Sequence, residues 1–208
     1  MIMIDRRFFI LGLGTTLAGC TGTGTPPSVM PDTLRQFQIA AIRVQGGEAI
    51  RSWPAQEAIY ARQANLSEEE AKRLGETMAG SVPALRQQME RALEALILAQ
   101  ARNQLGAAFP GKTPAELLVT VKVFDIPSLV RRVLIDQHAK IQLDIDLVEK
   151  SNGRSVMLFS GPLRTQFLLG GLSSIAQQGI QGDASDPSQL MVHNYMQDYA
   201  SWLMSANA

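Results

Sequence analysis

The strongest constraint on the fold is an alternating stretch of ten residues, 139–148, with the sequence AKIQLDIDLV. In a β-strand, successive side chains point to opposite faces. The apolar members therefore share one face: Ile141, Leu143, Ile145 and Leu147. The polar members share the other: Lys140, Gln142, Asp144 and Asp146. A strand with one buried and one wet face favours an antiparallel sheet over a parallel sheet covered on both sides.

Other segments also have strand composition. Residues 37–44 (FQIAAIRV) and 116–124 (ELLVTVKVF) are rich in β-branched residues, and 116–124 alternates as well. Asn152-Gly153 is typical of a tight hairpin turn, so Ser155–Leu163 is expected to return beside 139–148. The connection 125–138 is left open, since it could extend both flanking strands or hold a short helix near 129–134.

Three segments predict helices. Ser67-x-x-Glu70 is a capping box that starts a helix from Glu68 to about Met78. A longer helix is expected from about Val82 to Leu105, with one apolar face. A last helix begins at Asp186-Pro187, and its apolar stripe consists of Met191, Tyr195, Tyr199 and Trp202.

These elements predict a single α+β domain over residues 33–208. The expected order is β-α-α-β-β-β-α, with an antiparallel sheet of about four strands and helices packed on one face. Residues 48–65 stay ambiguous, because Pro54 biases Trp53 away from helix.

The N-terminus has the pattern of an export signal. Arg6 and Arg7 precede Phe8–Gly19, a run of 12 residues without charge. Such a run is too short to cross a bilayer, which needs about 20 apolar residues. It has the length and flanks of the apolar region of a secretory signal peptide. Residues 1–19 are therefore predicted to be a removable signal.

The residues Leu17-Ala18-Gly19-Cys20 resemble the lipobox of bacterial lipoproteins. The resemblance implies that the signal is cut before Cys20 and that Cys20 carries diacylglycerol and an N-acyl chain, with no other cofactor expected. Several acyl chains give stable membrane anchoring where one is marginal. Residues 20–32, rich in Gly, Thr and Pro, would then be a flexible tether.

The export route and the destination follow less directly. Asp5–Ile10 resembles a twin-arginine export motif but lacks the usual Ser/Thr before the arginine pair, so the general secretory route stays open. The residue after Cys20 is Thr21, not the Asp that retains lipoproteins at the inner membrane of enteric bacteria. The sequence therefore favours a periplasm-facing protein at the outer membrane over the inner one.

Composition excludes several classes of function. The chain has 19 Lys+Arg and 19 Asp+Glu, which is not the basic balance of a nucleic-acid binder. The single cysteine is assigned to the lipid, so no disulfide, zinc-binding cysteine set or thiol nucleophile is expected. Neither a Gly-x-Ser-x-Gly motif nor a phosphate-binding glycine loop is present. We expect no enzymatic activity and no metal site.

One catalytic alternative remains. Asp144 and Asp146 lie on one strand face, about 7 Å apart by strand geometry, and with His138 or His193 they could form a hydrolase site. A charged outer face of an amphipathic strand explains the two carboxylates more simply.

The segment from Phe167 to Ile180 is apolar, interrupted by glycine and free of charge. It is either a loop tucked onto the core or a surface that contacts a partner protein or the membrane. The candidate contact residues are Phe167, Leu168, Leu169, Leu172, Ile175 and Ile180. Three arginines could frame an anionic contact: Arg131, Arg132 and Arg164.

The order of signal, tether, small α+β domain and final helix resembles the auxiliary lipoproteins of envelope transport and assembly systems. That resemblance implies a lipid-anchored binding or scaffold subunit without catalysis, held at the membrane and possessing an envelope protein partner. Two alternatives are the hydrolase above and a carrier of a small lipidic ligand. The oligomeric state does not follow from the sequence.

Overall fold

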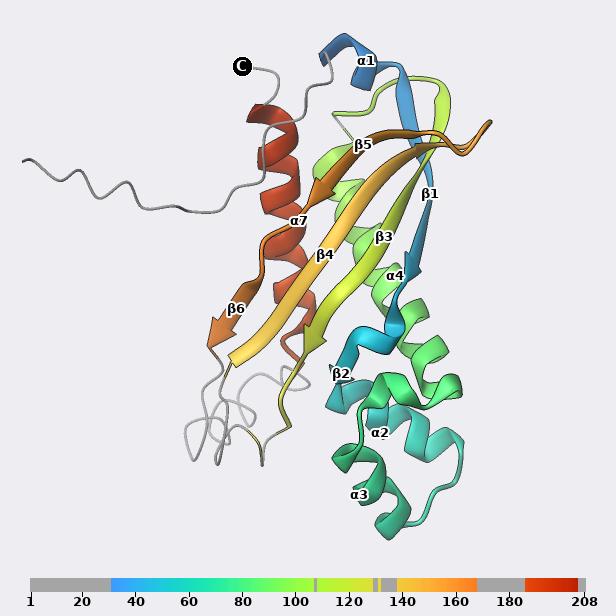
Figure 1. The fold of residues 1–208 in the computed structure, drawn as a ribbon, viewed down its shortest axis with the longest axis vertical. Helices are drawn as coiled ribbons and strands as arrows, with labels where there is room; N and C mark the ends of the chain where they lie inside the picture. Colours follow the sequence, from blue (N-terminus) through green and yellow to red (C-terminus); the bar gives the residue numbers. More distant parts are fainter. Residues whose placement is uncertain (1–30, 107, 129–130, 132–137, 168–185, 206–208) are drawn as a thin grey trace, which may run out of the picture.

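The computed structural model describes residues 31–106, 108–128, 131, 138–167 and 186–205 (Figure 1). The strands are β1 (Phe37–Gln45), β2 (Ile50–Ser52), β3 (Thr113–Asp125), β4 (His138–Glu149), β5 (Ser155–Ser160) and β6 (Arg164–Phe167). The helices are α1 (Pro31–Arg35), α2 (Pro54–Gln63), α3 (Glu68–Glu76), α4 (Pro83–Leu105) and α7 (Ser188–Ser205), with short 3-10 turns at Gly47–Ala49 and Ala79–Ser81. The predicted α+β class is confirmed.

The strands form one six-stranded sheet. Its main path is β1-β3-β4-β5, while β2 also pairs with β3 and β6 also pairs with β4. The pairs β3–β4, β4–β5 and β4–β6 are antiparallel, as expected because residues 139–148 were predicted to have one buried and one solvent-exposed face.

The expectation of a wholly antiparallel sheet of about four strands was wrong at one edge. Both β1 and β2 run parallel to β3. The reason is the connection between β1 and β3, which contains α2, α3 and the long helix α4. A helical crossover of this length returns the chain in the same direction, whereas antiparallel neighbours are joined by short turns.

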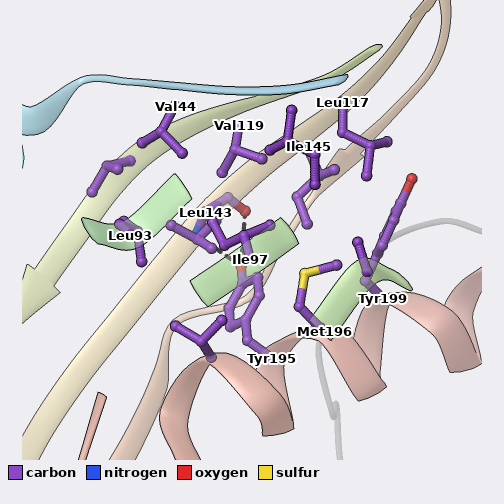
Figure 2. Packing of buried hydrophobic residues seen from close by; sticks show 14 of the residues in the cluster. Val44, Leu93, Ile97, Leu117, Val119, Leu143, Ile145, Tyr195, Met196 and Tyr199 are labelled. Carbon is purple, nitrogen blue, oxygen red and sulfur yellow. Dashed lines mark hydrogen bonds between the residues drawn. The ribbon is translucent and has the colours of Figure 1, made fainter. Parts of the chain in front are cut away.

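The alternation along β4 is preserved in the structure. Ile141, Leu143, Ile145 and Leu147 are buried, and the polar residues between them are partly exposed. Helices α4 and α7 cover the buried face together (Figure 1). Figure 2 shows the apolar layer where strand residues such as Val119 and Ile145 meet Leu93 and Ile97 of α4 and Met196 of α7.

Local signals explain where α3 and α2 begin. The capping box of α3 forms as predicted: the Ser67 hydroxyl accepts a hydrogen bond from the Glu70 amide, and the Glu70 carboxylate accepts one from the Ser67 amide. Pro54 occupies the first turn of α2 and leaves Trp53 as its N-cap, with an extended φ of −149°. Within the ambiguous segment 48–65, the structure therefore resolves a short strand and a helix.

The β4–β5 hairpin turns at the predicted place. Gly153 has a φ of +71°, a left-handed value that glycine adopts without strain. The returning chain then forms two strands, because β6 follows β5 and pairs with the first part of β4. The sequence analysis ended the returning strand at Leu163 and did not predict β6.

Candidate functional site

Asp144 and Asp146 lie on the face of β4 that points away from α4 and α7. The Lys122 ammonium lies 3.3 Å from Asp144 Oδ2. The Ser155 hydroxyl donates a 2.6 Å hydrogen bond to Asp146 Oδ1. Each carboxylate thus has its own cross-strand partner, which is the arrangement of a solvated sheet face rather than of a shared catalytic pair.

The two histidines are not brought to these carboxylates. His138 starts β4, six residues before Asp144, which corresponds to about 20 Å along a strand. His193 lies on α7, on the covered side of the sheet, where its Nδ1 is 2.9 Å from Gln100 Oε1 and 3.1 Å from Gln104 Nε2 of α4. Among the described residues, no group of three or more His, Cys, Asp or Glu side chains could hold a metal ion.

The described arginines do not form the predicted binding site for an anion, because each of them binds a carboxylate of its own. Arg131 holds the buried Asp125 through two hydrogen bonds of 2.9 and 3.1 Å. Arg164 Nε lies 2.7 Å from Asp198 Oδ2, which ties β6 to α7. Arg132 lies outside the described residues.

A small hollow lies between the β6 edge of the sheet and α7. Its volume is about 220 Å³, and it is lined by Ile141, Arg164, Thr165, Gln166, Met191, Asn194, Tyr195 and Asp198. Elsewhere the covered face of the sheet is apolar, but here β6 places Arg164 and Gln166 opposite Ile141 and Ala139 of β4. Gln166 Oε1 is buried and accepts no hydrogen bond from any described residue.

This hollow could hold a few waters or one small polar group, since ligand sites usually measure about 300–1,000 Å³. The sequence analysis noticed Arg164 but missed Asn194 and Asp198. These two are four residues apart, so they share one side of α7 beside its apolar stripe. The four-residue spacing was the sequence signal for a polar side of α7. It indicated no site, because the sequence did not show that β6 packs against this side of the helix.

The structure describes the candidate contact segment only at its first residue. Phe167 is the last residue of β6 and pairs with His138. The remaining candidates, Leu168, Leu169, Leu172, Ile175 and Ile180, lie outside the described residues. Elsewhere among the described residues, five large apolar side chains are about half exposed, and they are scattered over the fold: Met78, Leu158, Leu163, Leu190 and Met204.

The signal and lipid-attachment residues also lie outside the described part of the chain: Arg6, Arg7, Leu17, Ala18, Gly19 and Cys20. Within the described part, no helix combines the length and the hydropathy needed to cross a bilayer. The first described residue, Pro31, follows Cys20 by 11 positions.

Comparison with known proteins gives two distant structural likenesses. The dodecamer of a single-residue variant of PelC from Paraburkholderia phytofirmans matches with a TM-score of 0.38 and 12% identity, covering 85% of this chain and 93% of that one. A candidate lipoprotein from Caulobacter crescentus CB15 matches with a TM-score of 0.27 and 16% identity, covering 54% of this chain and 84% of that one. No family model and no curated protein matches. At these TM-scores the two likenesses support no functional argument.

Proposed function

We propose that this protein is a lipid-anchored binding subunit of the bacterial cell envelope and has no catalytic role. The observation that carries the proposal is Leu17-Ala18-Gly19-Cys20, which closes the uncharged run behind Arg6 and Arg7. The only cysteine of the chain stands at the position where the lipid would be attached. The protein would then face the periplasm from the outer membrane.

The described domain is consistent with a binding role. The residues that a hydrolase would need are spread over different faces and ends of the sheet, as Asp144 and His193 illustrate. A carrier of a lipidic ligand would need an apolar cavity between sheet and helices. Large side chains occupy that space instead, among them Leu93, Ile97 and Leu143, each fully buried.

The anchor is tested by metabolic labelling with an alkyne fatty acid in a bacterial host. We expect the wild-type protein to be labelled and recovered with membranes, and Cys20→Ala to be unlabelled. Thr21→Ala is the matched control, because it changes the adjacent residue and keeps the thiol. Unlabelled wild-type protein, or equal labelling of Cys20→Ala, would overturn the lipid-anchor proposal.

The binding role is tested on wild-type protein extracted from membranes in mild detergent. We expect the protein to migrate in a native gel as a complex of defined size, well above one 22.6 kDa chain in its detergent micelle. Crosslinking in intact cells before extraction should trap the same species. Migration as a monomer under both conditions would contradict a role as a subunit.

A further inference from the structure

Four basic residues gather at the end of the domain where the described chain begins. Lys112 bonds through its amide to the carbonyl of Gln36, the residue after Arg35. The Lys150 amide bonds to Pro114, two residues after Lys112. Arg154 accepts a backbone hydrogen bond from Glu149, the neighbour of Lys150. These contacts bring Arg35, Lys112, Lys150 and Arg154 to one tip, which we call the basic tip.

The charges of the basic tip are largely unopposed. All four side chains are exposed. No described acidic residue forms an ion pair with Arg35, Lys112 or Lys150. Arg154, with 73% of its side chain exposed, lies 3.5 Å from Glu149, whose carboxylate also accepts hydrogen bonds from neighbouring turn residues. Asp32 of α1 stands three residues before Arg35, so four cations and two carboxylates share this end, which leaves it net positive.

This local charge is not a property of the whole chain. Removal of residues 1–19 would leave 17 basic and 18 acidic residues. The opposite end of the domain carries α2 and α3, which together hold five acidic and three basic residues, with Glu68, Glu69 and Glu70 in the first turn of α3. Figure 1 places α3 far from α1 and from the β4–β5 turn, at opposite ends of the long axis. The domain is therefore electrically polarised along that axis.

The proposed lipid anchor would attach the domain to the membrane through the end that carries the basic tip. Residues 20–30 separate the acylated Cys20 from α1, and a flexible chain of that length has a root-mean-square span of roughly 18 Å. Fully extended, it would reach about 36 Å. The strand β4 alone, with 12 residues, is about 40 Å long. The tether would therefore keep the basic tip within about 36 Å of the bilayer, a limit that does not apply to the α3 end.

We propose that the basic tip docks on anionic phospholipid headgroups, so that the domain stands on the membrane with α2 and α3 pointing away from it. This inference rests on the proposed lipid anchor and specifies how the anchored domain is oriented. Each basic residue close to an anionic membrane surface strengthens binding about fivefold at moderate salt. The attraction decays over a Debye length, about 8 Å at physiological ionic strength.

The orientation can be measured on the processed, full-length lipoprotein in vesicles. In the processed lipoprotein the proposed acylation would block Cys20, so one introduced cysteine can carry a fluorophore specifically. Gln36→Cys reports on the basic tip, and Gln63→Cys, at the end of α2, reports on the opposite end; both glutamines are exposed. Vesicles contain a headgroup-attached quencher in phosphatidylcholine, either alone or with about one third phosphatidylglycerol.

We expect strong quenching at position 36 and weak quenching at position 63 in the anionic vesicles. In phosphatidylcholine alone, or at 1 M salt, quenching at position 36 should fall. Combining Arg35→Gln, Lys112→Gln and Lys150→Gln should lower the ratio of docked to undocked protein on the order of a hundredfold. The matched control combines Arg51→Gln, Arg62→Gln and Lys72→Gln, three exposed cations away from the tip, and should leave quenching unchanged.

The outcomes separate this inference from the anchor. If the anchor proposal is wrong, the wild-type protein takes up no fatty acid and does not remain with the vesicles. If only the docking proposal is wrong, the protein is acylated and vesicle-bound, but quenching at position 36 responds neither to lipid charge, nor to salt, nor to the triple tip variant. An equal loss in the control triple variant would also overturn it, because the effect would then follow total charge.

Discussion

The hydroxyl of Tyr195 binds both backbone groups of Leu143. It accepts a 2.9 Å hydrogen bond from the Leu143 amide and donates a 2.8 Å hydrogen bond to the Leu143 carbonyl (Figure 2). Leu143 lies in β4 at the point where its neighbour changes from β5 to β6. The Tyr195 side chain of α7 thus supplies hydrogen bonds to β4 in the gap between its pairing with β5 and its pairing with β6. This contact joins the last helix to the sheet.

We expect Tyr195→Phe to destabilise the fold. The change leaves the buried Leu143 amide without an acceptor, and an unsatisfied buried group of this kind costs about 1–3 kcal/mol. Urea unfolding followed by circular dichroism gives the free energy of unfolding. Tyr60→Phe, at a half-buried tyrosine of α2, is the control and should change it little. Equal stability of Tyr195→Phe and the wild type would contradict the role given to this hydroxyl.

Tyr199, one turn further along α7, should behave differently. Its hydroxyl is buried and hydrogen-bonded by no described residue, and burial raises the pKa of its phenol. Removal of an unpaired buried hydroxyl relieves its desolvation cost, so Tyr199→Phe should be neutral or stabilising by about 1 kcal/mol. The same unfolding experiment measures it, and a loss like that of Tyr195→Phe would reveal a missing partner.

Gly161, between β5 and β6, has no room for a side chain. A Cβ at this position would overlap with the Tyr195 hydroxyl and lie 2.7 Å from the Leu143 carbonyl oxygen. We expect Gly161→Ala to destabilise the fold by about 1–3 kcal/mol, the usual effect of overpacking. The exposed Gly75 of α3 is the matched control, since Gly75→Ala meets only ordinary contacts and should stabilise its helix by roughly 0.5–1 kcal/mol.

A double-mutant cycle tests whether Gly161 and Tyr195 act together. The losses for Gly161→Ala and Tyr195→Phe should not add, because each change disrupts the same contact with Leu143. Additive losses would mean that the glycine is required for another reason.

The elements that the sequence predicted well are those with strong local signals. The period of two in β4, the Ser67 capping box and the Asn152-Gly153 turn each act over a few residues, and the structure has all three. Among the longer elements of the described residues, α2 is the one that the sequence left open, within the ambiguous segment 48–65. Its apolar and polar residues do not separate into faces, and none of its residues is buried.

The missing parts of the prediction depend on contacts between distant residues. The parallel direction of β1 follows from where α4 packs, and nothing within residues 37–44 encodes it. The hollow beside β6 is lined by Arg164 and Asp198, which are 34 positions apart in the sequence and come together only in the folded chain. The basic tip likewise consists of residues that are far apart in the sequence. Backbone contacts bring Arg35 beside Lys112, Lys150 and Arg154 only in the folded chain.

The last two predictions concern pH, and the first of them concerns Glu57, in the first turn of α2. Desolvation raises the pKa of this carboxyl, although Glu57 Oε1 accepts a 2.8 Å hydrogen bond from the Trp53 amide. The folded state therefore binds the proton more tightly than the unfolded chain, whose pKa is near 4.5. Relative to Glu57→Gln, the wild type should lose stability as the pH rises from 4.5 through the higher native pKa, with no further change above it.

Glu70 provides the opposite case in the same protein. Hydrogen bonds from the Ser67 hydroxyl and amide lower the pKa of its carboxyl. Its contribution to stability is therefore present above about pH 4.5 and lost as the pH falls through the lower native pKa. The free energy of unfolding is measured in urea between pH 3 and 7. As the pH rises, the stability of the wild type should fall relative to Glu57→Gln and rise relative to Glu70→Gln. A constant difference between wild type and Glu57→Gln over this range would mean that burial does not perturb Glu57.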